Sequence, residues 1–296
     1  MLSGAPISIR CNMKSSISKS NGLLLLPAGL LVIFLYLIPL VYTLRESFKI
    51  HEPGRVGGLP GSFTLYNYLD FLHAAYLTVL SDTLFFSLIA AVVGIVLSYP
   101  LSYYLARGSS RIGKKIVLAI LVAMLFSGAI VRVYSISLTF GPVGIIAPLA
   151  HYFDISLGSI WYIETTLVVG LLNFVVPVAT LTLLATINNI DPQLEEAAQS
   201  LGAPRWFAFV DTTLRLSMKS IMSVALLGFS VSVSAFIVPL ILGRGIIVFA
   251  TNVIFARFAE IADHPSGAAV AIILLVISLA IIGAAQVTLK RFEPNL

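Results

Sequence analysis

Six long runs of apolar residues restrict the fold of this chain more than any other feature. They cover about Leu23–Leu44, Leu84–Ala106, Ile116–Phe140, Thr165–Ile187, Ile221–Leu242 and Ala268–Leu289. A hydrocarbon core about 30 Å thick needs roughly 20 apolar residues per helix. Only 10% of the residues are charged, against about 25% in soluble domains, so too little polar surface exists to coat a water-soluble globule. We therefore predict an all-α membrane protein with about six transmembrane helices.

The N-terminal region allows two interpretations. The first apolar run follows Arg10, Lys14 and Lys19, as the apolar core of a signal peptide would. However, the run is long and no Ala-x-Ala cleavage site follows it. We predict an uncleaved anchor after a cytoplasmic tail (residues 1–22), with a single transmembrane domain from residue 23 to residue 296.

The basic residues predict the orientation of the spans. They gather in alternate polar segments, at Arg10, Lys14, Lys19; Arg107, Arg111, Lys114, Lys115; Arg205, Arg215, Lys219; and Lys290, Arg291. In the other loops, acidic residues such as Asp70, Asp82 and Glu260 offset the basic ones. The positive-inside rule therefore places both termini in the cytoplasm. A net charge of +5 can indicate a nucleic-acid partner. Here the basic residues lie in short segments between apolar runs rather than on one face, so we expect no such partner.

The polar segment 188–219, between the fourth and fifth runs, is too long for a plain connection. Asp191 is suited to cap a helix that begins at Pro192, where a missing N–H costs nothing. Glu195 and Glu196 then lie near the positive end of the helix dipole. Gly202 is well placed for a left-handed C-cap. A second short helix is expected after Pro204.

The first of these helices carries an apolar stripe formed by Leu194, Ala197, Ala198 and Leu201. The small alanines allow another protein to approach closely. The alternative is a helix pair lying on lipid, but such helices usually have a polar face rich in Lys and Arg, which this segment lacks. We interpret the segment as a docking surface.

The sequence Glu196-Ala197-Ala198-x-x-x-Gly202 resembles the EAA loop of binding-protein-dependent ABC importer permeases. In that family the loop is a coupling helix that fits a groove on a cytoplasmic ATPase. The resemblance implies ATPase-coupling roles for Glu195, Glu196, Ala197, Ala198, Leu201, Gly202, Ala203 and Leu214. The family pattern continues with Ile-x-Leu-Pro, where this chain has Thr212 and Arg215 instead, so the usual proline kink is missing.

Other segments resemble the spermidine/putrescine-type subfamily of permeases with a type I fold. They are Tyr99–Arg107, Val131–Tyr134, Gly141–Ile146 and Phe236–Pro239. The resemblance implies two copies of an ATPase, a second permease (a homologous paralogue) and a periplasmic solute-binding protein, all at the bacterial inner membrane. It also implies that ATP and Mg²⁺ bind the ATPase. Gly108-x-x-x-x-Gly113-Lys114 lacks the Ser or Thr and the preceding strand of a phosphate-binding loop, so no cofactor is expected on this chain.

Candidates for the translocation path are polar or aromatic residues within the apolar runs. Each has a simpler explanation beside it: Arg132 can snorkel to the interface, Asn173 can bond another helix, and serines can serve close packing. The full set is Arg132, Tyr134, Asn173, Ser230, Ser234 and Phe236. With a single cysteine, Cys11, and no catalytic or metal-ligand constellation at membrane depth, we expect neither catalytic residues nor a metal site.

The sequence leaves two questions about function open. Polyamine-type permeases often carry an acidic residue just before the Phe of the fifth-span motif, but Ser234 and Ala235 stand there. This departure favours a neutral, zwitterionic or anionic solute with Arg132 as a partner, within a range of polyamine-like, amino-acid-like or small-anion solutes. The alternative function is a secondary transporter driven by an ion gradient, but matching halves and intramembrane carboxylates are not evident.

Overall fold

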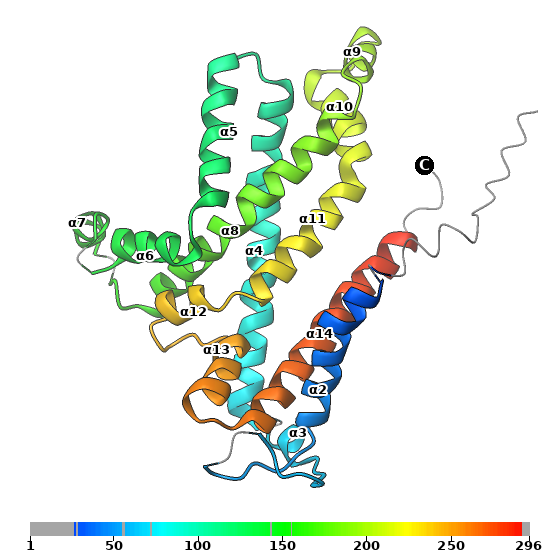
Figure 1. Ribbon diagram of the computed structural model, residues 1–296. Helices are drawn as coiled ribbons and strands as arrows, with labels where there is room; N and C mark the ends of the chain where they lie inside the picture. The colour runs from blue at the N-terminus through cyan, green and yellow to red at the C-terminus, as the bar shows by residue number, and fades with distance from the viewer. Residues whose placement is uncertain are drawn as a thin grey trace, which may run out of the picture. The chain divides into compact units, whose positions relative to one another are not determined.

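A computed structural model of the chain describes residues 27, 29–54, 57–71, 73–142, 144–154 and 156–291. All regular secondary structure in this part is helical (Figure 1). The predicted tail 1–22 and the beginning of the first predicted span lie outside the described residues. The chain forms two compact units, residues 1–45 and 46–296, which we describe separately.

The first unit ends with a helix, Gly29–Glu46, whose last residue begins the second unit, and this helix is long and apolar enough to cross a membrane. It contains a π-helical turn, η1 (Ile33–Leu37), followed by α2 (Ile38–Glu46). It corresponds to the described part of the first predicted span. Most of its large apolar side chains are exposed in the protein, as expected of a helix that faces lipid or another chain.

The second unit contains all the remaining helices. In chain order they are α3 (Tyr66–Asp70), α4 (Ala74–Arg107), α5 (Arg111–Phe126), α6 (Ala129–Phe140), α7 (Ala147–Tyr152), α8 (Ile160–Asn188), α9 (Gln193–Ser200), α10 (Arg205–Phe209), η2 (Val210–Leu214), α11 (Arg215–Val233), α12 (Ile237–Leu242), α13 (Ala250–Phe255), η3 (Ala256–Glu260) and α14 (His264–Arg291). Counting the first unit, the described residues contain five helices suited to span a membrane, or six if one bent pair is a single span.

The bent pair corrects the third predicted span. Instead of one helix over Ile116–Phe140, the chain turns by 110° between α5 and α6. Ser127 and Gly128 are both extended at the bend. Both residue types are poor helix formers in this context. An apolar composition persists across the bend, so hydropathy alone does not reveal it.

The core of the second unit is formed where α4, α8 and α11 pack along one another. A side chain at Gly94 of α4 would lie 2.6 Å from Val175 of α8, and one at Gly228 of α11 would lie 3.0 Å from the same valine. Small residues therefore allow three helices to meet closely around Val175, as is common in membrane proteins. Because α4 begins at Ala74, Asp82 lies within this helix and not in the predicted outer loop.

The fifth predicted span, Ile221–Leu242, is also not a single helix. The segment from Arg205 to Val233 forms one long helix, so the helix after Pro204 is not short, as predicted, but continues through η2 into α11. The chain then breaks and resumes in α12. Pro239 lies in the first turn of α12, where a missing N–H costs nothing. Ala235 lies at the break, outside both helices, and Thr251 Oγ1 donates a hydrogen bond to Ala235 O (2.7 Å).

A proline inside a span also leaves a carbonyl that needs a donor from elsewhere. Pro177 lies within α8 and cannot donate to the carbonyl of Asn173, four residues earlier. Arg132 Nη1 from α6 donates to Asn173 O (3.3 Å). Side chains from other helices thus donate to carbonyls left free at a break or at a proline, as a membrane interior requires.

This pairing of Arg132 with Pro177 is testable by a double-mutant cycle. Arg132→Leu should lower the thermal unfolding midpoint in detergent, since it leaves a buried carbonyl unpaired at a cost of about 1–3 kcal/mol. In a Pro177→Ala background, the restored backbone N–H can take the carbonyl, so the same change should cost less. The control is Arg244→Leu, which removes another bond to a carbonyl (3.0 Å, Leu157 O) and should be additive with Pro177→Ala. If the effect of Arg132→Leu is also the same with and without Pro177→Ala, the pairing is contradicted.

Candidate functional site

Helix α9 and the turn after it form a well-defined local structure. Asp191 Oδ1 accepts a hydrogen bond from Gln193 N (2.9 Å), so its side chain satisfies an N–H of the first turn as predicted, but Pro192 is the N-cap and the helix begins one residue later than predicted, at Gln193. At the other end, Gly202 has a φ of +92°. Ala203 N donates to Ala198 O (3.1 Å) and Gly202 N to Gln199 O (3.0 Å). These two bonds make a Schellman cap, so the predicted left-handed C-cap is confirmed.

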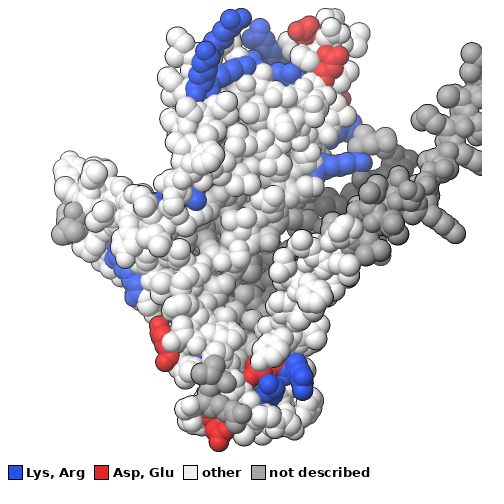
Figure 2. Space-filling view, in the orientation of Figure 1, with Lys and Arg blue, Asp and Glu red and all other residues white. Residues whose placement is uncertain are grey.

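Most of the residues predicted to contact an ATPase lie on the exposed side of α9 and its turn. Glu196, Ala197 and Gly202 are exposed, and Ala198 and Ala203 are half-buried. Leu201 is 90% exposed and Trp206, just beyond it, is 74% exposed. Figure 2 shows that charged side chains gather at this end of the second unit, whereas the face next to it is largely uncharged. The protein therefore presents small and apolar side chains among charged ones at one end.

Two residues of the same predicted set face the other way. Leu214, in η2, packs half-buried against the core cluster around Tyr99 and Leu183. Glu195 is half-buried and both of its oxygens accept hydrogen bonds from within the protein. Tyr103 Oη of α4 donates to Glu195 Oε2 (2.9 Å), and Thr213 Oγ1 of η2 donates to Glu195 Oε1.

Arg107 adds a further link near the start of this segment. As the last residue of α4, it donates through Nη2 to Ile190 O (2.5 Å) and to Ile187 O (3.3 Å). These carbonyls lie at and just after the end of α8, where helical partners are missing. The connection from α8 to α9 is thus held to α4.

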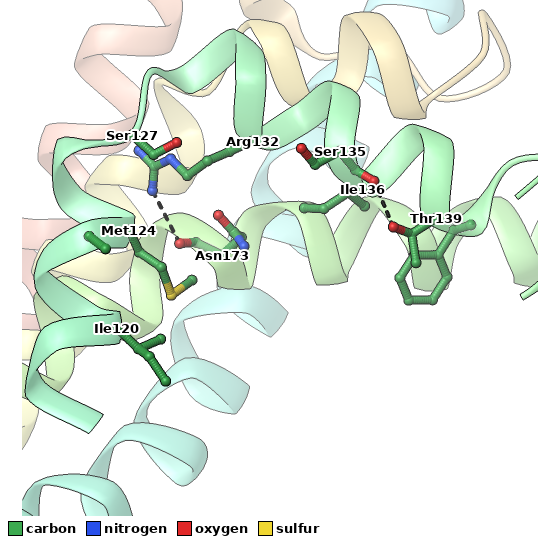
Figure 3. A pocket seen from close by; sticks show the side chains of 10 residues that line it. Ile120, Met124, Ser127, Arg132, Ser135, Ile136, Thr139 and Asn173 are labelled. Carbon is green, nitrogen blue, oxygen red and sulfur yellow. Dashed lines mark hydrogen bonds between the residues drawn. The ribbon is translucent and has the colours of Figure 1, made fainter. Parts of the chain in front are cut away.

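Two of the predicted path residues meet at one cavity (Figure 3). Arg132 of α6 and Asn173 of α8 line a cavity of about 410 Å³, together with Ile120, Ala123, Met124, Ser127, Ser135, Ile136, Thr139 and Phe140. The guanidinium carbon of Arg132 lies 4.0 Å from the centre of the Phe174 ring. Arg132 Nε and Asn173 Oδ1 are buried without a hydrogen-bond partner.

A second cavity of about 330 Å³ lies at the break between α11 and α12. It contains the predicted Ser234 and Phe236, and its other lining residues are Ala129, Leu171, Phe174, Val231, Ser232, Ala235, Ile237 and Val238. Phe174 connects the two cavities, since its ring packs on Arg132. The exposed Tyr134 and Ser230 line neither cavity, so the structure brings together four of the six predicted path residues in two neighbouring sites.

Sequence reasoning missed three residues of these sites. Phe174 follows Asn173 directly, and its place inside the same apolar run made it look like ordinary core. Tyr103 lies within a segment that resembles the subfamily, and no sequence motif marks Thr213. Their partner Glu195 lies 92 and 18 residues away, and no periodicity within one helix links such distant positions.

Comparison with known proteins identifies the family. The family model "Binding-protein-dependent transport system inner membrane component" matches residues 98–293. The "Spermidine/putrescine transport system permease protein PotB" of Salmonella typhimurium is 27% identical over 271 residues, which cover 90% of this chain and 92% of the relative. PotB of Escherichia coli is 28% identical over 255 residues, covering 84% and 90%. The "Molybdenum transport system permease protein ModB" of Haemophilus influenzae is 30% identical over 156 residues, covering 51% and 66%.

A solved structure supports the fold. A bacterial ABC transporter involved in the import of the acidic polysaccharide alginate contains a chain that matches with a TM-score of 0.75 at 16% identity, covering 93% of this chain and 96% of that one. The predicted resemblance to ABC importer permeases of the spermidine/putrescine type is confirmed. Since the family model matches most of the sequence, this chain belongs to the binding-protein-dependent transport system inner membrane components, which are the multi-pass permease subunits of ABC importers.

Proposed function

We propose that this permease imports a small organic solute as one half of a membrane-spanning pair. The second half is a homologous paralogue, and two ATPase subunits, which bind ATP and Mg²⁺, dock from the cytoplasm. A periplasmic protein delivers the solute. The names of the PotB relatives and the alginate transporter solved with its "periplasmic protein" support such an assembly. No observation on the described residues favours the ion-gradient-driven alternative.

The observation that carries the proposal is the exposed face of α9. Glu196 and Ala197 stand free at the surface beside the highly exposed Leu201. Exposed apolar side chains next to small residues are characteristic of a protein–protein contact. A groove on the ATPase can receive this face, with Glu196 as its charged contact. The cap at Gly202 fixes the direction in which the chain leaves the groove.

The proposed orientation puts α9 and both termini in the cytoplasm. The first turns of α5, which carry Arg111, Lys114 and Lys115, follow directly on the end of α4, and Arg107 at that end bonds the chain just before α9. Basic loops on one side indicate the cytoplasmic side. With α9 there, closure of an ATPase dimer would move the ends of α8 and α11, to which α9 is joined. Alternating access to the cavities would follow.

For the solute, we propose a neutral, zwitterionic or anionic molecule. The two cavities contain one ionised side chain, Arg132, and no acidic residue among the described residues that line them. A fixed positive charge in low-dielectric surroundings repels a polyamine. The Arg132 side chain lines the first cavity, and one of its nitrogens donates to Asn173 O. A guanidinium has five N–H donors, so a carboxylate or phosphate on the solute would pair with those that face the cavity.

The docking role of the α9 turn predicts a specific effect of Gly202→Val. A side chain at a left-handed φ costs roughly 1–2 kcal/mol, so the turn should lose its native shape. We expect the fraction of ATPase that co-purifies with the detergent-solubilised permease to fall about tenfold. Gly61→Val is the matched control, because Gly61 also has a positive φ (+76°) and open space around it, but lies in the loop before α3. Equal losses for both variants would argue against docking at Gly202.

The solute class predicts the response of the reconstituted importer. Small anions or zwitterions, presented with the binding protein, should stimulate ATP hydrolysis more than spermidine or putrescine does. Arg132→Gln should weaken that stimulation roughly tenfold, as expected for a lost hydrogen bond to a charged group. Arg244→Gln, an arginine outside both cavities, should leave it unchanged. Preference of the wild-type complex for spermidine or putrescine would refute the proposed class.

A further inference from the structure

We infer that Glu195 does not contact the ATPase but is a positioning residue that fastens the coupling helix α9 to the transmembrane helices. This inference rests on the proposed function, since it assumes that α9 docks on an ATPase. It separates the roles of two adjacent carboxylates: Glu196 faces outward to the partner, and Glu195 faces inward to the permease.

The geometry of Glu195 supports the inward role. Its two oxygens are each used by a hydroxyl from a different helix, Tyr103 Oη of α4 at 2.9 Å and Thr213 Oγ1 of η2. Hydrogen bonds to an ionised carboxylate are roughly twice as strong as those between neutral groups. A half-buried carboxylate that accepts such a bond at each oxygen is directed toward the permease and away from the outer face of α9.

The two donors are themselves held firmly. The Tyr103 ring packs edge-on against Phe209, with ring centres 4.8 Å apart. Thr213 is completely buried. One turn of α4 away, Tyr99 Oη and Ser217 Oγ form a buried hydrogen bond of 2.9 Å, which joins α4 to α11 directly. Glu195 therefore connects α9 to a part of the protein that is already rigid.

The consequence concerns how motion is transmitted. Helix α9 packs on α10 and η2, but its outer face is exposed, so few contacts resist a rocking movement of this short helix. Because Glu195 bonds α4 and η2 at once, a displacement of α9 must move both. Without this link, α9 could stay in the ATPase groove and tilt alone, and ATP would be hydrolysed without opening the cavities.

The experiment measures this transmission without knowledge of the solute. In the complete transporter, with Cys11→Ser and Ser234→Cys, a membrane-impermeant maleimide reports access to the cavity at the α11–α12 break. In the parent protein, ATP with vanadate should change the labelling rate at least about fivefold, the lower end of typical coupling between sites. With Glu195→Ala, the ATPase should still co-purify and hydrolyse ATP, but the change in labelling rate should nearly vanish.

Graded variants keep the test decisive if Glu195→Ala folds poorly. Glu195→Gln retains one acceptor oxygen and Tyr103→Phe removes one donor, so both should give intermediate responses. Tyr104→Phe is the matched control, because the Tyr104 hydroxyl lies beside Gly113 instead, and it should behave as the parent does.

Three results would overturn the inference in distinguishable ways. If Glu195→Ala releases the ATPase, Glu195 is a docking contact after all. If Glu195→Ala leaves the labelling response intact, the hydrogen bonds have no part in transmission. If no ATPase binds even the parent protein, the proposed function itself fails and the inference falls with it.

Discussion

The need to satisfy every backbone carbonyl in a medium without water governs this structure. Long helices meet the need along most of the chain, and the exceptions are informative. Pro177 deprives the carbonyl of Asn173 of its helical donor, and Arg132 donates to it instead. The break after α11 leaves the carbonyl of Ala235 outside a helix, and Thr251 donates to it. Irregular backbone is therefore tolerated only where neighbouring elements supply hydrogen bonds.

The two cavities lie at the places where helices are interrupted. One cavity lies beside the 110° bend between α5 and α6, and the other at the break between α11 and α12. Discontinuous helices are the usual means by which transporters expose polar groups at membrane depth. Arg132 thus has two effects: it donates a hydrogen bond to a backbone carbonyl, and it gives the cavity its positive charge. A structural and a solute-binding role for Arg132 do not exclude each other.

Apolar composition predicted where the spans are, but not their continuity. Hydropathy sums residues over a window, so Gly128 or Ser234 within an apolar run changes the sum little, although a helix ends next to each of them. Local capping chemistry at Asp191 and Gly202 could be predicted, because it depends on residues next to one another. The inward turn of Glu195 could not, since its partners come from α4 and η2. Helical periodicity shows that two faces exist, without saying which one is packed.

The two faces of α9 differ in what they contact, and Glu195 and Glu196 lie on different faces. Neighbouring residues on an α-helix point about 100° apart, so two consecutive carboxylates cannot share one environment on a helix that lies against a protein surface. Glu195 accepts hydrogen bonds from Tyr103 and Thr213, whereas Glu196 is exposed. A coupling helix needs both conditions at once: a free face to receive force from a partner, and a bonded face to pass it on. A helix of only 8 residues can meet both because successive side chains diverge so widely.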